Sequence, residues 1–84
     1  LDIDETRLYW TLVNWRNKMA KRSHYAYTWM VLNNITLYGV VEGSREDSFL
    51  LCDVSGLGGE GKKRKRYGAD IIKVLNDHHT NNPR

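Results

Sequence analysis

The stretch LYWTLVNWRNKMA, residues 8–20, decides the fold class of this chain because its apolar residues recur with a helical period. Leu8, Leu12, Trp15 and Met19 are spaced by four, three and four residues. This spacing places the four side chains on one face of an α-helix. The stretch therefore predicts a helix with a single buried stripe.

The charged residues on either side of this stripe predict where the helix ends. Asp4 and Glu5 suit a helix N-terminus, and Lys21 and Arg22 suit a C-terminus, because the helix macrodipole favours those signs. We therefore expect the first helix to run from about Asp4 to Ser23.

The middle of the chain predicts two short helical segments. YAYTWMVL, residues 25–32, is rich in β-branched and aromatic residues but has no partner strand elsewhere, so one or two helical turns are expected. Asn34 is expected to cap a following helix that Gly43 closes. The sequence S-R-E-D at residues 44–47 resembles a capping box and predicts a short helix through residues 49–52.

A last helix follows a glycine-rich turn. Its buried face is marked by Tyr67, Ile71, Val74 and Leu75. Together these segments predict an all-α fold, a compact bundle of five or six helices.

Length and composition predict one domain. The 84 residues leave room for a single core over residues 1–79 and a polar tail at 80–84. The chain starts without Met, so we expect it to be a piece of a longer protein. No apolar run approaches 18 residues, which predicts no membrane span. The single cysteine, Cys52, excludes an internal disulfide, suits an intracellular compartment and, within FLLC, is expected to be a core thiol.

The charge is unevenly distributed along the chain. Residues 62–73 carry six cations against Asp70, and residues 16–22 carry four cations and no acid. Residues 42–60 carry five acids against Arg45. We expect one basic and one acidic side, which suits a polyanionic partner, although two solvated helix faces would give the same pattern.

The most basic segment lies at the expected start of the last helix. Cations are unfavourable there unless something offsets them, and a bound phosphate would do so. The candidate nucleic-acid contacts are Lys62, Lys63, Arg64, Lys65 and Arg66, and the candidate phosphate-binding turn contains Gly56, Gly58 and Gly59. Two alternatives remain: the run lies before the true helix start and is solvated, or it serves as an import signal.

The first helix supplies a second candidate site. Lys18, Lys21 and Arg22 lie in its basic run, and Trp10 lies opposite the core stripe, where an exposed ring flanked by cations could stack on a base. Trp29 is a similar candidate. The alternative is that these tryptophans pack beneath another segment.

The sequence contains no motif that predicts an enzyme active site or a metal site. His24, His78 and His79 have no metal-ligand spacing to Cys52, and no phosphate-binding Gly-x-x-x-x-Gly-Lys-Ser/Thr motif occurs. We expect no catalytic residue, metal or cofactor. His78 and His79 are expected to interact with the dipole at the end of the last helix.

Three landmarks resemble the helicase-and-RNase-D C-terminal (HRDC) domain. They are LYWTLVNWRNKMA at residues 8–20, YTWMVLNNITL at 27–37, and DVSGLG at 53–58 followed by RYGADIIKVL at 66–75. Arg64 departs from the family, which usually has an aliphatic residue three positions before the tyrosine.

The resemblance implies a non-catalytic accessory domain of a larger protein, most often a RecQ-type, ATP-dependent DNA helicase. Such domains bind single-stranded or branched DNA weakly and tune substrate choice. An isolated domain is expected to be a monomer, in the nucleus of a eukaryote or the cytoplasm and nucleoid of a bacterium. The alternatives are a protein-interaction module that docks on the host's catalytic core or on another protein, and an RNA-binding domain of an RNase D-type exonuclease.

Overall fold

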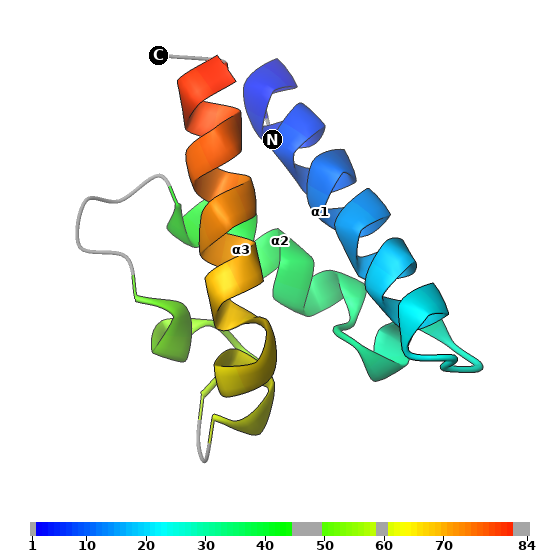
Figure 1. The fold of residues 1–84 in the computed structure, drawn as a ribbon. Helices are drawn as coiled ribbons and strands as arrows, with labels where there is room; N and C mark the ends of the chain where they lie inside the picture. The colour runs from blue at the N-terminus through cyan, green and yellow to red at the C-terminus, as the bar shows by residue number, and fades with distance from the viewer. Residues whose placement is uncertain (1, 45–49, 59–60, 82–84) are drawn as a thin grey trace.

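The computed structural model describes residues 2–44, 50–58 and 61–81. Within these ranges every regular element is helical and no strand occurs, which confirms the all-α prediction. The predicted count of five or six helices is not supported, because the described residues form three α-helices and two single 3₁₀ turns. In chain order these elements are α1 (Ile3–Arg22), η1 (Thr28–Met30), α2 (Asn34–Gly43), η2 (Leu51–Asp53) and α3 (Lys62–Asn81) (Figure 1).

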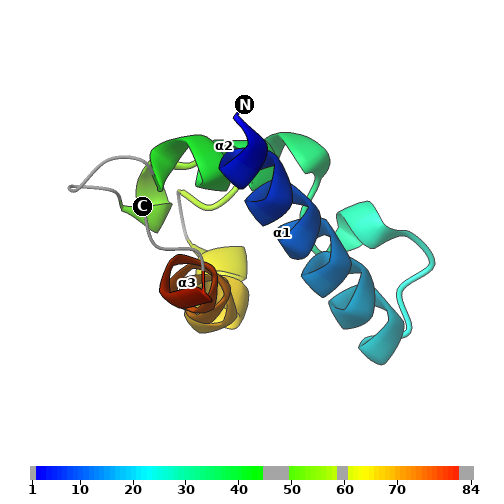
Figure 2. The same ribbon diagram turned by 90° about the horizontal axis from the view of Figure 1, so that it is seen from above.

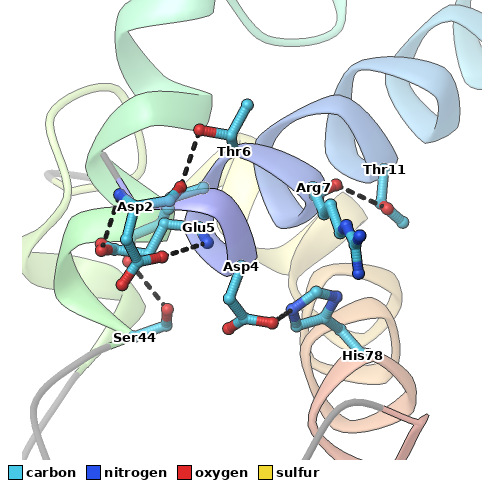
Figure 3. Close-up of polar contacts among 9 residues, drawn as sticks. Asp2, Asp4, Glu5, Thr6, Arg7, Thr11, Ser44 and His78 are labelled. Carbon is cyan, nitrogen blue, oxygen red and sulfur yellow. Dashed lines mark hydrogen bonds and ion pairs between the residues drawn. The ribbon is translucent and has the colours of Figure 1, made fainter.

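The helix α1 begins at a capping box. The backbone N–H of Glu5 donates to Asp2 Oδ1 at 2.7 Å, and the backbone N–H of Asp2 donates to Glu5 Oε1 at 3.4 Å (Figure 3). This reciprocal pair satisfies two of the N–H groups that a helix start leaves open. The predicted bounds, Asp4 to Ser23, were therefore one residue late at each end.

The helix α2 begins one residue earlier than its predicted cap implied. Asn33 is the capping residue, because its Oδ1 accepts from the backbone N–H of Thr36 at 2.8 Å. Asn34 lies inside the helix, and its Oδ1 accepts a hydrogen bond from Arg16 Nη1. The same Nη1 donates to the backbone carbonyl of Leu32 at 3.2 Å, so Arg16 ties α1 to the start of α2.

The segment between α2 and the glycine turn departs from prediction. Residues 45–49, which carry most of the proposed capping box, lie outside the described residues. Leu50 has an extended backbone, and only Leu51–Asp53 form a turn, so the predicted helix through residues 49–52 is wrong where it can be seen. Cys52 is exposed rather than a core thiol, because this short turn leaves it outside the packed helices.

The three helices converge on one core. Its members come from all three helices and from the connections between them, and the chain's radius of gyration of 12.3 Å matches the roughly 12 Å expected for a compact domain of this length. The core is formed by Leu8, Leu12, Val13, Ala20, Val31, Leu32, Leu37, Val40, Val41, Val54, Leu57, Tyr67, Ile71 and Leu75. The predicted stripes of α1 and α3 are thus confirmed, with Trp15, Met19 and Val74 packing at the core's edge.

The helices α1 and α3 lie close at one end and apart at the other (Figures 1 and 2). At the close end, His78 Nε2 near the end of α3 is 3.1 Å from Asp4 Oδ1 in the first turn of α1 (Figure 3). His78 is only 7% exposed. His78 and His79 occupy the last turn of α3, as their predicted interaction with its dipole requires. The helix continues through Thr80 and Asn81, which the sequence assigned to the tail.

Candidate nucleic-acid interface

The run of five cations forms the first turns of α3. The helix begins at Lys62, so the alternative in which the run precedes the helix start is wrong. No acidic residue lies in this first turn. The positive end of the helix macrodipole therefore adds to five side-chain charges instead of opposing them, which is unfavourable in the absence of an anion.

Arg64 differs from the other cations of the run because it is half-buried against the turn that precedes α3. Its Nη1 donates to the backbone carbonyl of Leu57 at 3.1 Å. Gly61, with a φ of +71°, makes room for the guanidinium: a Cβ on Gly61 would lie 2.6 Å from Arg64 Nη2. Arg64 therefore holds the turn. Its aliphatic stem lies beside Gly68, which gives this arginine a packing role at the position where the HRDC resemblance expects an aliphatic side chain.

Three of the remaining cations line a hollow of about 150 Å³, here called the basic hollow. Arg66 lies with its guanidinium carbon 5.9 Å from the Tyr25 ring centre and 5.5 Å from that of Tyr67, both within cation–π range. Lys65 is exposed but lies outside this lining. The basic hollow is formed by Tyr25, Met30, Lys62, Lys63, Arg66 and Tyr67.

Tyr67 forms the buried wall of the basic hollow. Burial raises the pKa of its phenol, a hydrogen bond with the Tyr25 side chain adds to the rise, and the charge of Arg66 opposes it. The phenol therefore stays neutral at physiological pH and places no negative charge beside the lysines. The hollow presents cations and aromatic rings, the two groups that bind a nucleic-acid strand through its phosphates and bases.

Two basic residues of α1 lie elsewhere, in a depression between α1 and α3 here called the interhelical groove. Lys18 and Arg22 form its α1 wall, and Lys73 lies among the charges of its α3 wall. Asp70 and Asp77 belong to the same α3 wall. The groove has a volume of about 350 Å³, and its floor is apolar, made of Trp15, Met19 and Val74.

The hollow and the groove are neighbours. Trp15 on the groove floor meets Tyr67 of the basic hollow edge to face, with ring centres 6.0 Å apart. Arg66 of the hollow and Asp70 of the groove are four residues apart on α3 and therefore adjacent on its surface. The structure thus brings together basic clusters from the two ends of the chain, but carboxylates interrupt the groove and not the hollow.

Close packing explains why glycines occupy the turn that precedes α3. A Cβ on Gly56, whose φ is +93°, would lie 2.4 Å from Thr36 Oγ1 on α2, and a Cβ on Gly58 would lie 3.0 Å from the carbonyl oxygen of Cys52. Thr36 Oγ1 in turn donates to the carbonyl of Ser55 at 2.9 Å. These glycines let the turn approach α2 and η2 closely. Gly59, the third predicted member of the phosphate-binding turn, lies outside the described residues.

The two candidate tryptophans are both on the surface. Trp10 is 58% exposed and Trp29 is 59% exposed, so neither packs beneath another described segment. Trp29 stacks on Tyr27 with ring centres 5.6 Å apart and an interplanar angle of 15°, and Met30 beside it belongs to the basic hollow. Trp10 and Lys21 lie in neither the hollow nor the groove.

Sequence reasoning missed three contributors to these surfaces and misjudged the exposure of a fourth residue, Arg16. Tyr25 and Met30 were seen only as parts of an apolar run, although their place beside Trp29 was a usable signal. Lys73 was counted among the cations of residues 62–73 but was not assigned to a surface, although its spacing of seven from Arg66 puts both residues on one side of α3. Arg16 was counted among the free cations, yet it is 6% exposed, and burial lowers the pKa of its guanidinium without removing its charge.

The described residues contain no group of three His, Cys, Asp or Glu side chains placed to hold a metal ion. In the same ranges, no helix is long and apolar enough to cross a bilayer. The absence of a cofactor and of a catalytic site stays a prediction from the sequence.

Comparison with known proteins adds no relative. The chain matches no family model, no curated protein and no solved structure. The resemblance to the HRDC domain therefore stays a prediction that rests on the sequence landmarks.

Proposed function

We propose that this chain is a non-catalytic nucleic-acid-binding domain that holds single-stranded or branched DNA at the basic hollow. The observation that carries the proposal is the gathering of Lys62, Lys63 and Arg66 with Tyr25 and Tyr67 around one depression at the N-terminus of α3. No carboxylate lies in that lining.

Electrostatics explains why this surface suits a phosphate. Three side-chain cations and the positive helix end lie together, and each phosphate that they neutralise releases counterions from the strand. The same phosphate offsets the unfavourable meeting of the cations with the helix dipole. A local arrangement that lowers stability without a partner is typical of a functional site.

The aromatic surroundings favour a single strand over a regular duplex. Unpaired bases can stack on exposed rings, whereas paired bases are already stacked within the duplex. Tyr27 and Trp29 lie in the same short segment as Tyr25 and Met30, so a strand whose phosphates meet Lys63 and Arg66 has rings within the same region. An RNA strand offers the same phosphates and bases and is the variant of this proposal.

The HRDC resemblance supplies the setting of the proposal. In that setting the domain belongs to a larger, RecQ-type DNA helicase, the host performs the ATP-driven chemistry, and this domain tunes the choice of substrate. Lys18 and Arg22, also predicted to contact nucleic acid, lie beyond Tyr67 in the interhelical groove, where two carboxylates disfavour a phosphate.

The test uses fluorescence anisotropy of a labelled single-stranded oligonucleotide titrated with the domain at several salt concentrations. Lys63→Gln and Arg66→Gln should each weaken binding several-fold and reduce the slope of log K against log salt by roughly 0.7, the value for one phosphate contact on a single strand. Lys65→Gln is the matched control, because Lys65 lies in the same helical turn but outside the hollow.

The comparison between Lys63 and Lys65 decides the proposal. If Lys65→Gln weakens binding as much as Lys63→Gln, the attraction is diffuse and the hollow is not the site. If the unaltered domain binds no single strand at low salt, the proposal is wrong. Arg64 is left unchanged in this series, because its substitution would disturb the turn that it holds.

A further inference from the structure

We propose that the interhelical groove docks an amphipathic helix of a partner protein, with acidic residues along the edge that faces α1 and basic residues along the edge that faces α3. The proposal goes beyond nucleic-acid binding, because the groove is a separate surface with different chemistry. It rests on the apolar floor of the groove and on the sign of the charges on its two walls.

The floor is the first element of the argument. Trp15, Met19 and Val74 are half-buried and line the groove together, although each also packs against the core. The lining residues come from both α1 and α3, and Figure 1 shows that these two helices diverge from their close end. A third helix laid along two diverging helices buries such a floor in the helix-in-groove mode of peptide recognition.

The walls are the second element, and they differ in sign. The α1 wall presents Lys18 and Arg22, one helical turn apart. The α3 wall presents two carboxylates, Asp70 and Asp77, with Lys73 between them. In the described part of the chain, none of these five side chains forms an ion pair within 4.0 Å, so all five charges are available to a partner.

The spacing of the α3 carboxylates defines the partner further. Asp70 and Asp77 are seven residues apart, which on a helix is about 10 Å along nearly the same line. A partner helix with Lys or Arg at positions seven residues apart would meet both carboxylates. Acidic residues on its other edge would meet Lys18 and Arg22.

A nucleic-acid strand fits this groove poorly. Its phosphates would pass close to Asp70 and Asp77, and like charges placed together cost binding. The basic hollow beside the groove has no such carboxylates. The observations therefore favour a polypeptide in the groove and leave the strand to the hollow.

The test uses a designed helical peptide of about 18 residues, roughly five turns. It carries Leu on one face, Glu along the edge facing α1, and Lys at two positions seven apart along the edge facing α3. Its control has the same composition with Glu and Lys exchanged. We expect the designed peptide to bind the domain at least tenfold more tightly than the control, because the control loses four exposed ion pairs that contribute about twofold each and places like charges opposite one another instead.

The binding site is located by NMR titration of the labelled domain. The designed peptide should shift the Trp15 indole and the Val74 amide resonances. Lys18→Glu should weaken it about fivefold, while Lys21→Glu, the same change of charge on the same helix but outside the groove, should not.

Four outcomes would overturn the proposal. They are equal binding of the two peptides, shifts that avoid Trp15 and Val74, and an equal effect of the Lys18 and Lys21 substitutions. The fourth is occupation of the groove by something else: single-stranded DNA shifting the Trp15 and Val74 resonances, or self-association of the domain protecting them.

Discussion

The two ends of the α1–α3 pair differ in the charges that their helix termini carry. At the close end, acidic Asp4 and Glu5 start α1 with the sign that its dipole favours, and the last turn of α3 holds His78 and His79, of which His78 contacts Asp4 of α1. At the open end, α1 again finishes with a favourable pair, Lys21 and Arg22, but α3 starts with five cations and no acid.

This difference distinguishes the close end, where side-chain contacts stabilise the fold, from the open end, where the charges of α3 do not. The close end is joined by a partly buried contact between Asp4 and His78, and α1 begins there at a capping box. The open end is held instead by the backbone of the glycine turn and by Arg64, while its other cations face outward. The end that is electrostatically unfavourable without a partner is the end where we place nucleic-acid binding.

The largest expected effect tests whether backbone geometry holds the open end. Gly56→Ala should reduce the free energy of unfolding by about 2–4 kcal/mol, because a side chain at positive φ is strained and its Cβ would displace the Thr36 hydroxyl. Urea denaturation followed by circular dichroism measures the change.

Gly68→Ala is the matched control for this prediction. Gly68 lies within α3, and a Cβ there would meet Leu51 at 3.5 Å, an ordinary contact. Because alanine favours a helix over glycine, this variant should be neutral or more stable by up to about 1 kcal/mol. A Gly56→Ala variant as stable as Gly68→Ala would show that the turn does not hold the open end.

The next effect tests the contact at the close end. His78→Ala should lower the free energy of unfolding by about 1–3 kcal/mol, because it removes a buried ring and leaves Asp4 without that partner. His79→Ala removes the neighbouring, less buried ring and should cost about 0.5 kcal/mol or less. Thermal unfolding of the two variants compares them, and equal losses would mean that the Asp4 contact contributes nothing.

The smallest effect concerns pH at the wall of the basic hollow. Burial raises the pKa of Tyr67 in the folded state, so the unfolded chain loses this proton first, near pH 10, and folding stability falls as pH rises above that value. The loss from this residue grows with pH until the phenol of the folded protein titrates as well. Tyr67→Phe should show a shallower decline between pH 9 and 11 in urea melts. Parallel declines would mean that Tyr67 titrates alike in both states.

Helices with a regular apolar period were predictable from sequence. The stripes of α1 and α3 are buried as expected, because each helix needs only its own residues to place apolar groups on one face. The segments without such a period were not. The cap of α2 was placed at Asn34 instead of Asn33, because two adjacent asparagines offer the same local chemistry and Arg16, from α1, selects between them.

The candidate site was predictable as a list of residues but not as a surface. The basic run and Trp29 were identified, yet the sequence could not separate Arg64, which holds a turn, from Lys63 and Arg66, which line a hollow. It also could not show that Lys18 lines the same groove as two aspartates of another helix. Both distinctions depend on contacts between residues far apart in the chain.

The sequence by itself determined the all-α fold class, the position of the two long helices and the excess of positive charge at the start of α3, because period, helix propensity and charge belong to the residues themselves. Tertiary structure alone decided which polar and charged side chains are exposed and which neighbours they have. Arg16 is buried by α2, Cys52 is left exposed by a short turn, and Lys18 gains carboxylate neighbours from α3. Exposure and neighbourhood arise only when the helices pack, and packing joins residues that no local pattern relates.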